Sequence, residues 1–306
     1  MRCFKGMIGL AKKSNYKVQI FANVIMFIIS LMTILPFALL IIASFTKNTD
    51  ITLYGYSFFP KNWSLDAYSY IWTERDQIFN AYFITIIVTT IGTTIGLLTS
   101  VLYAYALSKP RFPGKSFFSI FLFFTMLFNG GLVPTYIMYT QYFHIKNTLW
   151  ALIIPNLLMN AFNVILIRSY LQNNIPQALI EAAFIDGANE YQIVHKIVFP
   201  MAKPIITVIG LFIGLAYWND WMNGLYYVTD NNLYSIQQLL NNMMKNIEYL
   251  SKNANSNINL SNIASAIPQA TVRMAIAVIG ILPILVVYPF VQKYFVRGIA
   301  LGAVKG

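Results

Sequence analysis

Charge, cysteine and histidine are all scarce in this chain of 306 residues, and each shortage excludes a class of protein. Only 10% of the residues are charged and 58% are hydrophobic, whereas a soluble domain carries about 25% charged residues. The single cysteine, Cys3, excludes an internal disulfide framework and a cysteine-based metal cluster. The two histidines, His144 and His195, are too distant in the sequence to predict a metal site. The composition therefore predicts a membrane protein that crosses the bilayer several times.

The apolar stretches also lack ionisable residues at their centres. Asp220 and Arg273 fall near predicted outer ends, and Arg168 falls near an inner end, where we interpret it as reaching the lipid headgroups. A transporter driven by an ion gradient usually needs charged residues at membrane depth, so this class is disfavoured. No G-x-x-x-x-G-K-[ST] segment occurs, so the chain is not predicted to bind ATP through one.

Six apolar stretches are long enough to cross a bilayer, which takes about 20 apolar residues. We predict an all-α membrane protein with one transmembrane domain over residues 1–306. The predicted spans cover about 20–45, 80–107, 116–138, 149–171, 203–226 and 268–291. Gly130, Gly131 and Pro134 predict a kink or break in the third span. Gly92 and Gly96 in the second predict close helix packing, which we assign to packing within this chain rather than to a dimer.

The positive charges predict that both termini lie in the cytoplasm. The segments predicted to be inside hold 14 of the 21 Lys and Arg residues but only three of the ten acids. This bias follows the positive-inside rule, so the net charge of +11 has a topological explanation and does not predict nucleic-acid binding. The outer segments are then 46–79 and 229–267, the second with an amphipathic helix over Ser235 to Leu250, and 173–202 is a cytoplasmic loop.

That cytoplasmic loop is the long polar interruption in the second half of the chain. A helix is predicted over Gln177 to Asp186, with small and apolar residues recurring along one face. Gly187 ends this helix because glycine readily adopts the left-handed conformation. Asn189 and Gln192 have the spacing of a capping box, which predicts a second helix. The expected structure is therefore helix, glycine turn, helix.

The sequence of this loop resembles the EAA loop of the permease subunits of ABC importers. The matching residues are Glu181, Ala182, Ala183, Asp186, Gly187, Ala188 and Pro200. In that family the loop is the coupling element, which docks into a cleft on a cytoplasmic ATPase. The resemblance implies that these residues contact the ATPase and that Glu181 pairs with a basic group there. The alternative is an ordinary helical loop that joins two spans.

Two further segments resemble the maltose-type sugar permeases. Trp218-Asn219-Asp220-Trp221 resembles their WND segment, although an aromatic belt at the lipid interface is the alternative. The C-terminal Gly302-Ala303-Val304-Lys305-Gly306 resembles their tail, which reaches into the ATPase dimer. This implies ATPase contacts by Gly302, Val304 and Lys305, the alternative being a frayed basic end.

The resemblance implies a type I ABC importer permease fold in a bacterial inner (plasma) membrane. The implied cargo is a sugar of the oligosaccharide or aldouronate kind. The implied partners are a second homologous permease, an ATPase dimer, an extracytoplasmic sugar-binding protein that would touch residues 229–267, and membrane lipid. ATP and Mg²⁺ would be held by the ATPase, so this chain is expected to be neither an enzyme nor a cofactor protein.

Aromatic and amide side chains are the candidates for contact with a sugar, because rings stack on sugars and amides bond to hydroxyls. These candidates are Tyr103, Tyr105, Trp218, Asn219 and Asn223. Core packing is the alternative for each, and in the maltose-type complex the partner permease holds the sugar. Two other functions stay open: a permease for peptides or amino acids, and an ABC membrane subunit that transports nothing. The second class usually carries a large outer domain, for which 229–267 is too short.

Overall fold

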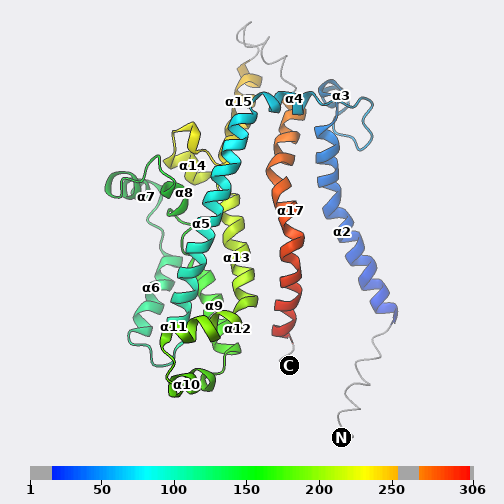
Figure 1. Ribbon diagram of the computed structural model, residues 1–306. Coiled ribbons are helices and arrows are strands. Elements are labelled where there is room, and N and C mark those ends of the chain that lie inside the picture. The colour runs from blue at the N-terminus through cyan, green and yellow to red at the C-terminus, as the bar shows by residue number, and fades with distance from the viewer. Residues whose placement is uncertain (1–15, 254–268, 304–306) are drawn as a thin grey trace. The chain divides into compact units, whose positions relative to one another are not determined.

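The computed structural model describes residues 16–253 and 269–303, which form helices and one isolated antiparallel bridge between Thr46 and Trp63. The expected helical fold is confirmed for these residues. The chain divides into two units, 1–73 with 247–279 and 74–246 with 280–306 (Figure 1). Two helices, α15 (Ile236–Asn253) and α17 (Gln269–Ala303), contribute to both units.

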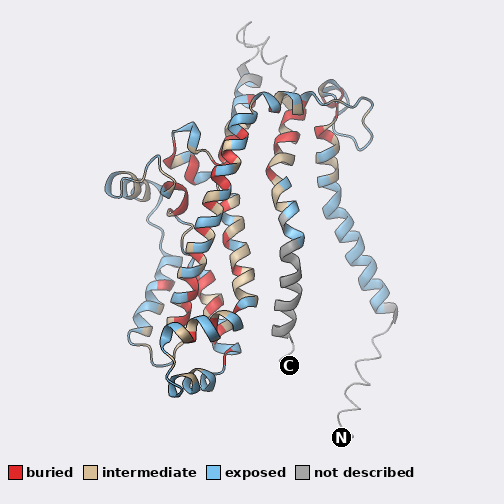
Figure 2. Ribbon diagram, viewed as in Figure 1, coloured by how far each residue is buried: buried red, intermediate tan, exposed pale blue. Residues whose placement is uncertain are grey.

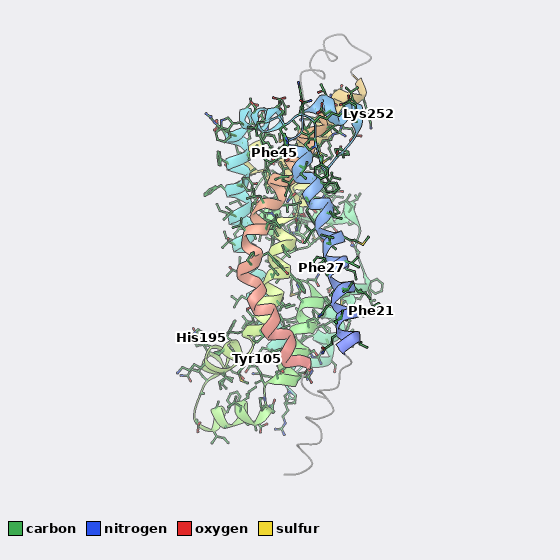
Figure 3. All side chains as sticks on the ribbon, turned by 90° about the vertical axis from the view of Figure 1, so that its right-hand side faces the viewer. Phe21, Phe27, Phe45, Tyr105, His195 and Lys252 are labelled. Carbon is green, nitrogen blue, oxygen red and sulfur yellow. The ribbon has the colours of Figure 1, made fainter. Side chains whose placement is uncertain are left out.

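The first unit contains a long helix whose apolar side chains are uncovered. This helix, α2 (Tyr16–Ser44), has no buried residue in its most apolar 18-residue window, and its surface is exposed along almost its whole length (Figure 2). Phe21 and Phe27 are 67% and 69% exposed and project from the helix (Figure 3). A helix that is apolar on all sides needs lipid or protein around it, so α2 has the properties of a membrane span.

Short helices follow α2 and are held to it by polar and aromatic contacts. They are α3 (Asn48–Tyr54) and α4 (Asp66–Thr73). The Tyr68 and Ser44 hydroxyls lie 2.8 Å apart, and the Tyr68 ring stacks on Phe45 at 4.8 Å. The Asp50 carboxylate accepts a hydrogen bond from the Asn62 backbone N–H at 2.9 Å. Much of the predicted outer segment 46–79 is therefore folded.

The second unit is built around three helices that pack on one another, α5 (Arg75–Ser108), α9 (Ala161–Asn174) and α13 (Lys203–Trp218). Shorter elements surround them: α6 (Lys115–Leu127), α7 (Leu132–Ile137), η1 (Met138–Tyr142), α8 (Trp150–Ile153), α10 (Gln177–Ile185), α11 (Glu190–Ile193), η2 (Val194–Val198), α12 (Phe199–Met201), α14 (Met222–Tyr227) and η3 (Asn231–Leu233). In Figure 1, α10 to α12 lie at one end of this unit, and α7, α8 and α14 lie toward the other.

Two glycines let a neighbouring side chain and a neighbouring backbone approach α5 closely. Gly92 faces the Tyr217 ring, and a Cβ on Gly96 would lie 2.8 Å from the Leu158 carbonyl oxygen. Both contacts are within this chain, as expected for the Gly92-x-x-x-Gly96 pattern.

Gly96→Ala is expected to lower the free energy of unfolding by about 1–3 kcal/mol, because overpacking a rigid backbone contact forces a shift of structure. Thermal unfolding of the purified protein in detergent would measure this loss. Gly130→Ala is the matched control, since nothing lies within 4 Å of a Cβ at Gly130. Equal unfolding temperatures for the two variants would contradict the close approach.

Three of the predicted spans are interrupted. The expected break in 116–138 is present, because α6 and α7 are separated by Phe128 to Gly131 and bend by 114°. The helices also do not run unbroken through 149–171, where α8 ends at Ile153 and α9 begins at Ala161, or through 203–226, where α13 ends at Trp218. By length and composition, α2, α5 and α17 each suffice for a span, and two bent pairs bring the number to five among the described residues.

Candidate functional site

The loop at one end of the second unit has the predicted helix, turn and helix. The first helix, α10, ends before Gly187, whose φ is +80°, and α11 begins directly after Asn189. The capping box is confirmed: the Gln192 backbone N–H donates to Asn189 Oδ1, and the Asn189 backbone N–H donates to Gln192 Oε1, both at 2.9 Å. These local bonds fix the direction in which α11 leaves the turn.

The face of α10 that points away from the unit is small and apolar. Ala178, Ala182 and Ile185 are exposed, and Ile185 is 86% exposed. The opposite side carries Ile180 and Ala183, which pack against the hydrophobic core. Figure 2 shows α10 almost entirely as exposed surface. An exposed apolar cluster of this kind is a candidate surface for an interaction.

The residues predicted to couple to an ATPase are mostly accessible. Exposed are Glu181, Ala182, Asp186, Gly187 and Pro200, and half-buried are Ala183 and Ala188. The second half of the loop is anchored instead, because Ile193, Val198 and Ala202 are fully buried. The first half of the loop, with α10, is thus mostly exposed, and the second half, from Ile193 to Ala202, is packed against the core.

Glu190, at the start of α11, makes a link that sequence reasoning missed. Its Oε2 accepts a hydrogen bond from the Tyr105 hydroxyl at 2.9 Å, and its Oε1 pairs with Lys109 Nζ. Tyr105 and His195 lie at the same end of the second unit in Figure 3. The sequence offered one weak signal for this link. Glu190 is an acid in the loop 173–202, and Lys109 to Lys115 is a basic segment far earlier in the chain.

The three helix interruptions meet at a cavity of about 410 Å³ toward the other end of the unit. It is lined by Asn129, Gly131, Leu132, Thr135, Asn156, Leu157, Asp220, Met222, Asn223, Tyr226 and Tyr227. Irregular backbone at membrane depth is tolerated only where it is covered by protein or borders a cavity. The non-helical backbone at the three breaks therefore borders the cavity, where it can be tolerated.

Side chains from α13 and α14 bond the carbonyl groups that the interruption after α8 releases. The Tyr217 hydroxyl donates to the Ile153 carbonyl at 2.8 Å, and Asn223 Nδ2 donates to the Pro155 carbonyl at 3.0 Å. Asp220 Oδ1 accepts from the backbone N–H groups of Met222 and Asn223. Tyr217 and Asn223 thus have a structural role, because they satisfy backbone carbonyl groups that lack a helical partner.

The candidate sugar-contacting residues do not all gather at this cavity. Asn223 lines it, and Trp218 and Asn219 lie just before the same break. Tyr103 donates to the Phe118 carbonyl on α6 at 3.0 Å, and Tyr105 donates to Glu190 at the start of α11, so both belong to the packing of α5. Sequence reasoning missed Asn129, Asn156 and Tyr226. The only signal for Asn129 and Asn156 was their position beside a helix-breaking glycine or proline.

The predicted outer segment 229–267 contains the expected amphipathic helix, α15. Its apolar residues Ile236, Leu239 and Leu240 are buried, and the Ile236 backbone N–H donates to Thr85 Oγ1 on α5 at 2.8 Å. Ser235 donates to the Asp220 carbonyl at 3.1 Å. The start of α15 is therefore attached to α5 and to the break that borders the cavity.

Some of the predicted sites fall beyond what is described. Cys3, residues 254–267 of the outer segment, Val304 and Lys305 lie outside the described residues. Gly302 lies in the last turn of α17.

Helices that are long and apolar enough to cross a bilayer define a membrane protein. The family described as "Binding-protein-dependent transport system inner membrane component" matches residues 113–301, and the chain belongs to this family. The resemblance to ABC importer permeases and the multi-pass, inner-membrane location are thereby confirmed.

Individual relatives match nearly the whole chain. The polygalacturonan/rhamnogalacturonan transport system permease protein YtcP of Bacillus subtilis (strain 168) is 36% identical over 96% of this chain and 100% of its own length. Protein LplC of the same organism is 34% identical over 90% of each chain. A crystal structure of a bacterial ABC transporter involved in the import of the acidic polysaccharide alginate has a chain with a TM-score of 0.74 and 29% identity, covering 93% of this chain and 98% of its own.

Proposed function

We propose that this permease carries a complex oligosaccharide, together with a second homologous permease, an ATPase dimer and an extracytoplasmic sugar-binding protein. Relatives named for polygalacturonan/rhamnogalacturonan and arabinooligosaccharide transport support a carbohydrate, and so does the likeness to the alginate importer. These names give no support to a peptide or amino-acid substrate, or to a subunit that transports nothing. Two of them concern acidic sugar polymers, which makes an acidic oligosaccharide the substrate to test first.

The exposed apolar face of α10 is the observation that carries the coupling role. This face consists of Ala178, Ala182 and Ile185, which are exposed in the described chain and therefore do not contribute to its core. Their apolar surface fits an interaction with a partner. ATP and Mg²⁺ would be bound by that partner, and closure of the ATPase dimer would move α10. Glu181, exposed on the same helix, would pair with a basic group of the ATPase. The tail at Gly302, Val304 and Lys305 would add a second contact.

The proposed topology has six spans with both termini in the cytoplasm. The helices α2, α5 and α17, the bent pair α6 and α7, and α13 with α14 would supply five spans, and α8 with α9 would supply the interrupted sixth. The distribution of positive charge supports this orientation. It places α10 inside the cell and the folded segment around Phe59 outside.

The native protein has one cysteine, so the topology and the docking can be tested with two variants in a Cys3→Ser background. Ala182→Cys is expected to cross-link to an ABC-type ATPase and to resist an impermeant thiol reagent added to intact cells. Phe59→Cys, at a side chain that is 90% exposed, is expected to react with that reagent and to give no ATPase cross-link. The reverse labelling pattern would overturn the proposed orientation and the coupling role with it.

The cavity at the three helix interruptions is proposed as part of the sugar path, with Asn223 in its lining. Trp218 and Asn219 come just before the same break in the chain, but the Trp218 indole N–H donates to the Gly280 carbonyl at 3.4 Å. The amide and tyrosine lining of the cavity supports this role, and its volume lies within the range of about 300–1,000 Å³ typical of ligand sites. The Tyr227 ring at its edge stacks on Tyr136 at 5.8 Å, which keeps that ring fixed.

Asn156→Gly is expected to raise the KM for uptake about fivefold, the effect of losing one hydrogen bond to the substrate. Glycine suits this position because Asn156 has a φ of +62°, so the variant removes the amide without straining the backbone. The control is His144→Gly, at a φ of +51°, which makes the same change away from the cavity. Transport assays in membrane vesicles would compare them, and identical KM values would remove Asn156 from the path.

A further inference from the structure

Three side chains near the cytoplasmic end of α5 form a closed set of contacts with the coupling loop. Glu190 accepts from the Tyr105 hydroxyl at 2.9 Å and pairs with Lys109 Nζ. Lys109 Nζ also lies 4.7 Å from the centre of the Tyr105 ring. Each member therefore contacts the other two. We call this set, Tyr105, Lys109 and Glu190, the α5–loop joint.

The Glu190 side chain is 53% exposed, but its partners are ordered, so the joint differs from an isolated ion pair at a protein surface. Exposed pairs contribute little, because water screens them and both side chains must be ordered. Here Tyr105 is only 6% exposed and is fixed in the core, so its hydroxyl presents a positioned donor to Glu190. Lys109 is held as well, since its backbone carbonyl accepts from Lys115 Nζ at 2.9 Å. The loop is thus bonded to a site that is already ordered.

The second half of the loop is otherwise held mainly by apolar packing, with one long hydrogen bond from the Tyr170 hydroxyl to the Met201 carbonyl at 3.4 Å. Ile193, Val198 and Ala202 are fully buried in the core, and such packing has no fixed direction. Hydrogen bonds are directional, so they determine the register of one element on another. The joint is therefore the contact best suited to make α11 and α5 move as one body.

If α11 and α5 move as one body, a movement of the loop would be carried along α5 to the opposite end of the second unit. The helix has 34 residues and a length of about 50 Å at 1.5 Å per residue. Along it, Gly92 and Gly96 contact Tyr217 and the backbone at Leu158, and Thr85 accepts the hydrogen bond from Ile236 of α15. The coupling loop is thereby connected to the region of the helix interruptions.

We propose that the α5–loop joint transmits the movement of the coupling loop to α5, with Glu190 as the positioning residue. This inference rests on the proposed coupling function of the loop. Glu190 would not bind the ATPase itself. Its effect would be on how much transport each cycle of ATP hydrolysis produces.

The test uses the complete importer in proteoliposomes, with both permeases, the ATPase dimer and the sugar-loaded binding protein. Sugar uptake and ATP hydrolysis are measured together, and the Ala182→Cys cross-link reports docking. Glu190→Gln and Lys109→Met are each expected to lower uptake per ATP about tenfold, comparable to losing one charge-assisted hydrogen bond, with the cross-link unchanged. Tyr105→Phe removes one bond only and is expected to have a smaller effect in the same direction.

Two controls separate transmission from a general loss of structure. Lys196→Met removes an exposed positive charge from the same loop and is expected to leave uptake per ATP unchanged. The exchanged pair Lys109→Glu with Glu190→Lys restores opposite charges and is expected to recover much of the loss. The non-additivity of Tyr105→Phe and Glu190→Gln would show that the two residues act together.

Each outcome decides the proposal. Normal uptake per ATP in Glu190→Gln and Lys109→Met would overturn the joint and leave the coupling role of α10 intact. Loss of the cross-link together with uptake would show that Glu190 shapes the docking surface, which also overturns transmission. Failure of the cross-link in the otherwise unchanged permease would instead overturn the proposed function itself.

Discussion

Replacing Gly187 with valine is expected to reduce sugar uptake at least tenfold while the permease still accumulates in the membrane. Gly187 has a φ of +80°, and a β-branched residue in the left-handed region costs about 1–2 kcal/mol. Nothing lies within 4 Å of a Cβ built at this position, so the damage is conformational rather than steric. Relief of this strain would turn α10 relative to α11 and misdirect its apolar face. Uptake in vesicles, normalised to the amount of permease, would measure the loss.

Gly187→Asn is the matched control, because asparagine adopts the left-handed conformation more readily than other residues with a Cβ. It is expected to retain more than half of the uptake. If asparagine and valine proved equally damaging, the conformation of the turn would not be the cause. If valine were harmless, the direction of α10 would not matter for coupling.

The helix, turn and helix over 177–202 were predictable because their determinants are local. Gly187 ends one helix, and Asn189 and Gln192 begin the next through bonds between residues three positions apart. Such bonds depend on few neighbours, so spacing in the sequence is enough to predict them. The buried face of α15 was predictable for the same reason, from the helical spacing of its apolar residues.

The cavity and the α5–loop joint were not predictable, because their determinants are distant in the sequence. The stretch 149–171 is apolar enough for an unbroken span, yet its carbonyl groups at Ile153 and Pro155 are bonded by Tyr217 and Asn223. Only the folded chain supplies these donors, so the sequence of the stretch alone favours a continuous helix. Tyr105 was assigned to the sugar path by its residue type, whereas its neighbours place it against Glu190.

A second large loss of sugar uptake is expected for Ile185→Glu, because Ile185 lies on the exposed face of α10. The side chain is 86% exposed, so its removal is expected to change the free energy of unfolding by no more than about 0.5 kcal/mol. Docking would bury the new carboxylate in an apolar contact, and an unpaired buried charge carries a large desolvation cost. We therefore expect at least a tenfold loss of uptake, with loss of the ATPase from the purified complex.

Ile185→Leu and Phe59→Glu serve as the controls for this change. Leucine keeps the apolar surface and is expected to retain uptake. Phe59→Glu adds the same charge at a side chain that is 90% exposed on the proposed outer side, where no ATPase could dock. Thermal unfolding, co-purification of the ATPase and uptake would be measured for all three variants. An Ile185→Glu permease that kept its ATPase would show that the partner binds elsewhere, since a docked apolar face could not accommodate the charge.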